Sequence, residues 1–266
     1  MSEEQLVTYE LEGDIALVCL NRPEKRNAFN PDVATALAHA VIRANEEAKI
    51  GIIYGKGDHF CAGLDLEHFR NRMSKGDAKA RRRSQILGPG GARGFDLIAR
   101  GDIPWVSALH GAVIGGGFEM AASTHIRVAD TTAFFALPEG QRGIYVGAGA
   151  SVRVSRLISV ARMTDLMLTG RVMKADEAER CNAVQYVVEK GKHLEKAKEL
   201  AKIIASNRQE SNFAVINSLP RIADLSYNDG LYVEGLVAMG IYSEESTKRL
   251  TDFLEGKARR LKPTEE

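Results

Sequence analysis

The sequence has few cysteines, and the three that it has, Cys19, Cys61 and Cys181, lie far apart. They are too few and too scattered for a disulfide framework, and their spacing is not that of metal ligands. This usage is typical of a reducing compartment. We therefore expect a protein with no structural disulfide and no bound metal.

Long apolar runs are also absent. No run approaches the roughly 20 residues that a membrane-spanning helix needs. The first ten residues, MSEEQLVTYE, are acidic and lack both the apolar core of a signal peptide and the arginine-rich character of a transit peptide. We therefore predict a cytoplasmic protein that does not bind a membrane.

Neither sign of charge is in excess. The chain of 266 residues has 36 Lys and Arg against 35 Asp and Glu, which gives a net charge of +1. No global field then favours nucleic acid or an anionic surface, so any recognition by charge must be local. Hydrophobic residues make up 44% of the chain, which is enough to bury the core of one large domain or of a domain with an appendage.

Several common motifs of nucleotide-binding and hydrolytic proteins are missing. The triplet Gly115-Gly116-Gly117 fits neither the phosphate-loop pattern nor the dinucleotide fingerprint. No G-x-S-x-G elbow is present to carry a nucleophilic serine. His110 and His125 follow or precede strand-like runs, and we interpret both as structural histidines.

The pattern along the chain alternates between strands and helices. Runs 7–12 and 15–21 flank Gly13-Asp14 and predict a hairpin, Pro31 begins a helical pattern, and run 50–55 reads as a strand. The alternation recurs between 103 and 140. We therefore expect an α/β core.

The second half of the chain is dominated by helical spacing. We place an α/β core over residues 1–190 and a helical C-terminal region over 191–266. The charged, glycine-bearing region 67–94 is interpreted as a helix and a mobile loop.

The glycine triplet sits between an apolar run and Glu119. The modest interpretation is a tight strand-to-helix turn, with Glu119 placed favourably in the first helical turn. A second glycine turn at Gly63 and a second carboxylate at Glu139 indicate a catalytic site instead. Two turns can aim two backbone N–H groups at one point, and two carboxylates can flank that point as acid and base.

Basic residues allow two interpretations. Arg70, Arg72 and the run Arg81 to Arg83 form either a solvated helix face or an anchor for an anionic group such as phosphate. Lys25, Arg26 and Lys56 are open to the same two interpretations.

Read in order, the stretches HFCAGLDL, HGAVIGGGFEM and ALPEGQRGIYVGAGA resemble the crotonase superfamily, over nearly the whole chain. The resemblance implies a crotonase-like spiral of β-β-α units with a C-terminal helical trimerisation region, which often gives a dimer of trimers. It also implies an acyl-CoA thioester as substrate, so that coenzyme A enters with the substrate and no separate cofactor is needed.

The resemblance also implies roles for single residues. The two oxyanion-hole amides fall on Leu64 and Gly116, Glu119 becomes the base towards water, and Glu139 becomes the acid at Cα. Gly147 matches a glycine that lies near the attacking water. The positions that correspond to coenzyme A contacts are Ala62, Gly63, Leu64, Asp65 and Leu66 and, by a looser match, Lys25, Arg26 and Lys56.

The chain departs from the family pattern at a few positions. Val146 stands where many hydratases have proline, and GASVR replaces GGTQR. Leu64 is bulkier than the alanine often found there, which leaves its N–H available but reshapes the acyl pocket. Tyr145 either lines that pocket or packs as an ordinary aromatic residue.

The leading hypothesis is an enoyl-CoA hydratase that adds water to a trans-2-enoyl-CoA. Retention of both glutamates favours it, because several related isomerases need only one acid/base carboxylate. A hydratase/aldolase, an isomerase or a thioester hydrolase remains an alternative. A non-catalytic CoA-binding scaffold is disfavoured, because it would have no chemical need for both glutamates.

Overall fold

The computed structural model describes residues 5–74 and 90–257, and they form two compact units, Met1–Asn212 and Phe213–Glu266. The first unit contains the strands. The basic run Arg81 to Arg83 lies outside the described residues, whereas residues 90–94, at the end of the region predicted as a helix and a loop, belong to helix α4 (Gly90–Arg100).

The predicted hairpin is confirmed. Strands β1 (Val7–Glu12) and β2 (Ile15–Leu20) pair antiparallel, and Gly13 between them has the positive φ of 60° that a tight turn requires. Every residue of β2 is buried. A continuous apolar run such as this one is typical of a strand that is covered on both faces.

Strand β2 leads into a six-stranded sheet with the order β1-β2-β3-β4-β6-β9. The strands that follow β2 run parallel to it. Their bounds are β3 (Ile50–Gly55), β4 (Trp105–Leu109), β6 (Ile126–Asp130) and β9 (Tyr186–Val188). Because parallel strands share one carboxyl edge, the loops after β3 and β4 emerge at the same edge of the sheet.

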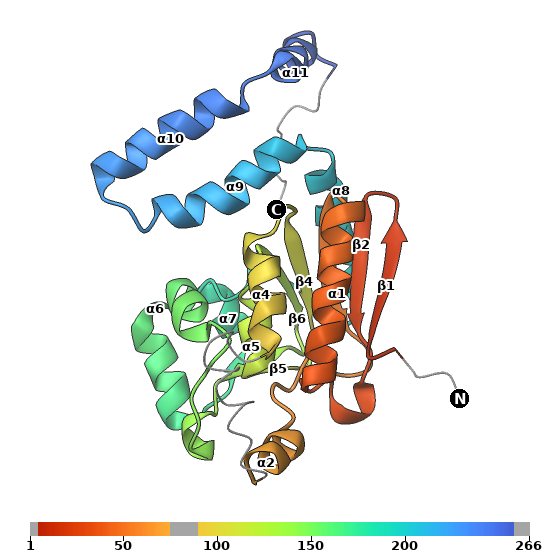
Figure 1. Cartoon of the computed structure of the whole chain (residues 1–266), viewed down its shortest axis with the longest axis vertical. Coiled ribbons are helices and arrows are strands. Elements are labelled where there is room, and N and C mark those ends of the chain that lie inside the picture. Colours follow the sequence, from red (N-terminus) through yellow and green to blue (C-terminus); the bar gives the residue numbers. More distant parts are fainter. Residues whose placement is uncertain (1–4, 75–89, 258–266) are drawn as a thin grey trace. The chain divides into compact units, whose positions relative to one another are not determined.

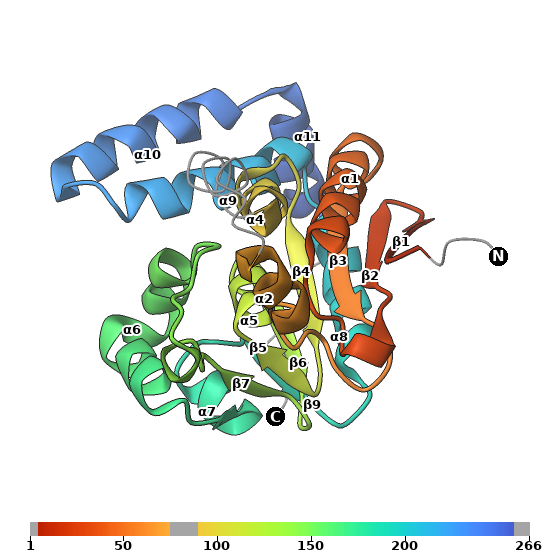
Figure 2. The same ribbon diagram turned by 60° about the horizontal axis from the view of Figure 1, so that its bottom comes forward.

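Helices cover both faces of this sheet (Figures 1 and 2). Helices α1 (Pro31–Glu47) and α4 (Gly90–Arg100) lie on one face, and α8 (His193–Ala205) lies on the other. Helix α1 begins as predicted, with Pro31 in its first turn and the Asn30 side chain accepting a hydrogen bond from the Val33 N–H at 2.9 Å.

The first unit extends past the boundary predicted at 190/191, because α8 packs with the sheet of that unit. Ala197, Leu200 and Ala201 of α8 pack with Leu17, Ile52 and Val106 of the sheet in one apolar cluster. Without α8 that face of the sheet would be open to water. The first unit therefore extends to Asn212.

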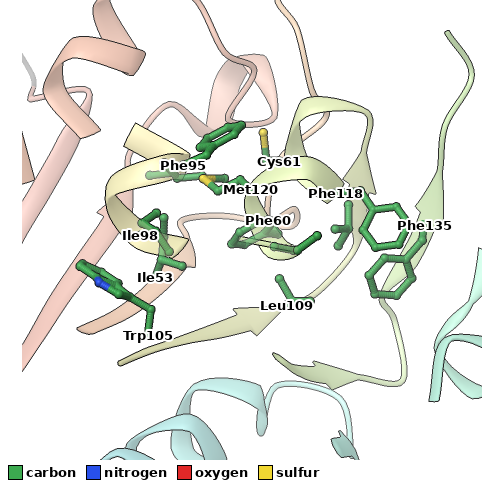
Figure 3. Packing of buried hydrophobic residues seen from close by; sticks show 14 of the residues in the cluster. Ile53, Phe60, Cys61, Phe95, Ile98, Trp105, Leu109, Phe118, Met120 and Phe135 are labelled. Atoms are coloured by element: carbon green, nitrogen blue, oxygen red, sulfur yellow. The ribbon is translucent and has the colours of Figure 1, made fainter. Parts of the chain in front are cut away.

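A second, small sheet joins β5 (Ala112–Ile114), β7 (Phe134–Ala136) and β8 (Met173–Lys174). Between the two sheets lies the apolar core shown in Figure 3, where Phe118 and Phe135 have ring centroids 5.1 Å apart. The core fixes helix α5 (Gly116–Ala121), because Phe118 and Met120 of this helix are fully buried.

The remaining elements of the first unit are short helices and one long, kinked helix. They are η1 (Pro23–Lys25), α2 (Leu66–Ser74), η2 (Gly140–Arg142), α6 (Ala150–Thr169) and α7 (Ala175–Arg180).

Three helices account for the C-terminal part. They are α9 (Gln209–Ile222), α10 (Tyr227–Ile241) and α11 (Glu244–Leu254). Over the described ranges, no helix is long and apolar enough to cross a membrane.

The kink in α6 generates a stability prediction. Ser159 has φ 70° and ψ 156° inside the helix, a backbone region that essentially only glycine adopts without strain. We expect Ser159→Gly to raise the free energy of unfolding by about 1 kcal/mol and the Tm by about 2–4 °C. The Ser159 Oγ, which lies 3.5 Å from the Arg162 N, contributes little that would be lost.

Thermal unfolding followed by circular dichroism measures this effect. The control is Ser155→Gly in the regular part of the same helix, where glycine should destabilise by about 0.5–1 kcal/mol. A lower Tm for Ser159→Gly would contradict the strain argument.

Candidate active site

The segment after β3 is held between two other pieces of backbone. Cys61 forms a parallel bridge with Val113 of β5, and Leu64 forms one with Phe29. Gly63 between them has φ 88°, and a Cβ built on it would lie 2.6 Å from the carbonyl oxygen of Ile114. Only glycine fits there, so the close approach of this segment to β5 depends on Gly63.

This pairing leaves one amide of the segment unused. The carbonyl of Gly63 accepts from Phe29 N–H at 2.7 Å, and the N–H of Asp65 donates to the Phe29 carbonyl at 2.8 Å. The Leu64 N–H between them has no backbone acceptor among the described residues. It is therefore free to donate to a ligand.

Gly116 supplies a second amide at the same place. It is the first residue of α5, where the N–H has no partner within the helix. A Cβ built on Gly116 would lie 3.9 Å from the backbone nitrogen of Leu64, so the two amides are close neighbours. The two residues predicted to form an oxyanion hole are thus brought together.

The three consecutive glycines meet three different steric demands. Gly115 has φ 51°, and a Cβ on it would lie 2.6 Å from Glu139 Oε1. A Cβ on Gly117 would lie 2.9 Å from the Cβ of Cys61 and even closer to its carbonyl. For Gly116 the nearest atom would be 3.8 Å away, which is ordinary contact. The glycine at 116 therefore leaves open space, whereas its neighbours relieve clashes.

Glu119 lies one turn further along α5 and is only 5% exposed. Its Oε1 accepts hydrogen bonds from the N–H groups of Ala148 at 2.9 Å and Ala150 at 3.1 Å. These amides belong to the start of α6, where the helix dipole also favours negative charge. One carboxylate oxygen of Glu119 is therefore held by two backbone N–H donors.

Glu139 lies beside Glu119 in different surroundings. It precedes η2, is 6% exposed, and its Oε2 has no hydrogen-bond partner within the described part of the chain. Burial, with a smaller contribution from the charge of Glu119, raises the pKa of Glu139 above its usual range. The two buried glutamates thus have unlike surroundings: Glu119 Oε1 accepts two N–H groups, whereas Glu139 Oε2 has no partner among the described residues.

Most of the predicted coenzyme A positions come together around the start of α2. The Ala62 N–H donates to the Arg26 carbonyl at 3.0 Å, and Lys25 Nζ lies 3.5 Å from Glu67 Oε2 on the surface. Leu64 and Leu66 are both exposed apolar side chains. Gly147 is exposed next to Ala148, whose N–H contacts Glu119.

The Asp65 side chain serves the protein itself. It accepts from Arg22 Nη1 at 2.8 Å and from the His68 N–H at 3.1 Å, so it joins the loop after β2 to the first turn of α2. Burial opposes ionisation, but these two donors hold the pKa of Asp65 below its ordinary value. The backbone of Asp65 is also used within the protein, because its N–H donates to the Phe29 carbonyl and its carbonyl accepts from the Phe69 N–H at 2.9 Å.

Sequence reasoning missed two residues that organise this region. Asn27 is buried with φ 55°, and its Nδ2 donates to the carbonyls of Lys56 and His59. Arg22 is the partner of Asp65. Both lie in the stretch NRPEKRNAF, but nothing in their local pattern reveals a partner about 30 or 40 residues away.

The histidines interpreted as structural occupy structural places. His110 Nε2 is 2.8 Å from the Gly57 carbonyl, and His125 Nδ1 accepts from the Trp105 N–H at 3.0 Å. Burial lowers the pKa of His125 to about 4. In the part of the chain that the structure describes, no group of three or more His, Cys, Asp or Glu is placed to hold a metal ion.

Two unused amides beside two buried glutamates of unlike surroundings form a candidate acid–base site for chemistry next to a carbonyl group. The family follows from comparison with known proteins. The model of the enoyl-CoA hydratase/isomerase family matches residues 10–262, and the chain belongs to this family.

Individual relatives agree with the family match. The chain is 35% identical to the short-chain-enoyl-CoA hydratase of Clostridium acetobutylicum over 204 residues, 76% of each chain. The crystal structure of a "putative enoyl-CoA hydratase" from Rhodopseudomonas palustris CGA009 has 42% identity and a TM-score of 0.87 over 95% of each chain. That of an enoyl-CoA hydratase from Bacillus anthracis has 26% identity and a TM-score of 0.86, over 97% of this chain and 99% of that one.

The unequal surroundings of the two glutamates predict opposite effects on stability. Glu139 has a raised pKa in the folded state, so its ionised form destabilises the fold at pH values above that raised pKa. Glu139→Gln should therefore raise the Tm at neutral pH, and the gain should vanish as the pH falls below the ordinary value of 4.5. Glu119→Gln should lower stability at neutral pH by about 1 kcal/mol or more, because a neutral amide accepts the two N–H groups more weakly.

Unfolding of both variants from pH 4 to pH 8 checks the two signs together. A Glu139→Gln variant that is less stable than the parent at neutral pH would contradict the assignment of a raised pKa.

Proposed function

We propose that this protein is an enoyl-CoA hydratase, which adds water across the double bond of a trans-2-enoyl-CoA thioester. The observation that carries the proposal is the pair of buried glutamates with unlike hydrogen-bond surroundings beside two free amides. Membership of the enoyl-CoA hydratase/isomerase family supports it.

In the proposed reaction the thioester oxygen accepts hydrogen bonds from the N–H groups of Leu64 and Gly116. These donors stabilise the negative charge that develops on the oxygen when the nucleophile adds to Cβ. The N-terminus of α5 adds its dipole at the same place. The amides are fixed by backbone pairing, so little reorganisation is needed when the charge forms.

The two glutamates then divide the proton transfers. Water held between them loses a proton to Glu119 as its oxygen bonds to Cβ, and Glu139 delivers a proton to Cα. This division follows the observed surroundings, because Glu119 receives two N–H donors and Glu139 has an unpartnered, buried oxygen. Both proton transfers are general acid–base steps, which typically contribute about 100- to 10,000-fold each.

The activity test follows loss of the conjugated thioester absorbance with crotonyl-CoA and then with cinnamoyl-CoA-type substrates. We expect hydration by the parent protein and a loss of roughly 100-fold or more in kcat for Glu119→Gln and for Glu139→Gln. Asp165→Asn, a carboxylate substitution on the surface of α6, serves as the control. Full turnover by both glutamate variants would refute the mechanism.

Product analysis separates the other family chemistries. Isomerisation, carbon–carbon cleavage or thioester hydrolysis of an acyl-CoA, without hydration of any enoyl-CoA, would refute the hydratase proposal. Binding of acyl-CoA with no turnover would instead indicate a scaffold.

Gly116→Ala tests the oxyanion hole directly. The added methyl group clashes with no protein atom but lies 3.9 Å from the Leu64 nitrogen, in the space that the thioester oxygen needs. We expect a folded protein that loses roughly 100- to 1000-fold in kcat, the cost of one lost oxyanion donor. Gly117→Ala should instead lower the Tm, because its methyl group meets Cys61. A Gly116→Ala variant with parental kcat would refute the hole.

We further propose that the backbone of residues 62–66, together with Lys25 and Arg26, binds the coenzyme A part of the substrate. The segment is pinned by β5 and by Phe29 and has exposed positions beside the free amide of Leu64. Coenzyme A would then be the only coenzyme needed. The scattered, reduced cysteines support a cytoplasmic location.

The second unit supports an oligomer, which we propose is a homotrimer or a dimer of trimers. Helix α10 is apolar around its circumference, yet Gly230 is its only buried residue. Tyr232 is 69% exposed and Met239 is 70% exposed. A helix that is hydrophobic all round is normally buried, so these residues require a partner surface.

Light scattering after size exclusion tests the assembly. We expect Tyr232→Glu with Met239→Glu to give smaller species, whereas Glu234→Gln on the same helix should keep the parental mass. A monomeric parent protein would refute the proposed oligomer.

A further inference from the structure

The residue that contacts Glu119 most closely is bound at both of its own backbone polar groups. The Ala148 N–H donates to Glu119 Oε1 at 2.9 Å, and the Ala148 carbonyl accepts from Nη2 of Arg153. A single residue thus links the carboxylate of Glu119 to a guanidinium group in the first turn of α6.

That guanidinium group is itself fixed on two sides. Its Nη1 lies 3.1 Å from Asp96 Oδ1 on α4. It also lies against Gly149, since a Cβ built there would lie 2.5 Å from Cζ and 2.9 Å from Nη1 of Arg153. Gly149 has φ 103°, so both its backbone conformation and its lack of a side chain serve this contact.

The contact places the guanidinium group largely out of water. The Arg153 side chain is only 17% exposed, whereas that of Asp96 is 58% exposed. The Nε of Arg153 is buried and has no hydrogen-bond partner among the residues that the structure describes. A buried, unpaired N–H is costly, and a surface ion pair alone would not require it.

From these contacts we propose that Arg153 is a positioning residue, which holds the turn 147–149 so that the N–H groups of Ala148 and Ala150 stay on Glu119. Asp96 in turn fixes the guanidinium group. As a statement about catalysis this inference rests on the proposed hydratase function, but the positioning itself is a property of the turn and is measurable without substrate.

The alternative is that Arg153 only ties α6 to α4. Arginine rather than lysine is required for positioning, because a planar fork donates to the Ala148 carbonyl and the Asp96 carboxylate at once. A merely structural ion pair tolerates lysine. Arg153→Lys and Arg153→Met therefore behave alike if the residue positions the turn.

Hydrogen–deuterium exchange, read by mass spectrometry on peptides that cover residues 144–152, tests the turn without substrate. We expect the Ala148 and Ala150 amides to exchange roughly 10-fold faster or more in Arg153→Met and Arg153→Lys, because their hydrogen bonds open more often. The control is Arg180→Met, which removes an exposed pair with Asp176 on α7 and should leave this exchange unchanged.

Steady-state kinetics with crotonyl-CoA tests the catalytic consequence. We expect both Arg153 variants to lose roughly 10- to 100-fold in kcat with KM changed less than about 3-fold, because Glu119 is displaced while the binding surfaces remain. Asp96→Asn should show a smaller loss of the same kind. Arg180→Met should match the parent.

Each outcome decides the proposal. Parental exchange and parental kcat in Arg153→Met, even with a lower Tm, would show a purely structural ion pair and overturn it. So would a rise in KM alone. If Arg153→Met does not fold, Arg153→Lys and Asp96→Asn make the same comparison. If the parent hydrates no enoyl-CoA, the hydratase proposal fails, while the exchange measurement still decides whether Arg153 positions the turn.

Discussion

Close contact between the first turn of α5 and the segment 61–64 is the constraint on which the rest of the site depends. The contact is possible because Gly117 and Gly63 have no side chain where Cys61 and Ile114 approach. It places the free amide of Leu64 beside that of Gly116, in a frame of backbone hydrogen bonds. Glycine costs conformational entropy on folding, but at positions 63 and 117 it allows the close contact that fixes the two N–H donors.

The site also gives two glutamate side chains, Glu119 and Glu139, different environments. Both glutamates are buried within this frame, but Glu119 meets the amides at the start of α6, whereas Glu139 has one oxygen without a partner. The difference comes from the start of α6, which supplies both N–H donors to Glu119. The turn 147–149 is therefore as much a part of the site as the carboxylates. A residue such as Arg153 that fixes this turn then matters for chemistry without touching a substrate.

Local patterns predicted much of this arrangement. The hairpin at Gly13, the start of α1 at Pro31 and the glycine turns before Leu64 and Glu119 each depend on neighbours in the sequence. What the sequence could not show are contacts across distance. The Arg22–Asp65 pair spans 43 positions, and helical spacing alone could not show that α8 packs on the sheet of the first unit. Helix α10 lies within the region predicted as helical, but its three glycines and its apolar circumference hide its own bounds in the sequence.

The proposed hydrogen-bond donors belong to the backbone, and this bears on substrate specificity. The proposed donors are backbone N–H groups, so a change of side chain at position 64 leaves the donor in place. Leu64, Leu66 and Tyr145 are all exposed, and they project from elements whose backbone is already fixed by the sheets and by η2. Under the proposed function, substitution of these side chains would change the shape that an acyl group meets, while the amides and the two glutamates stay where they are.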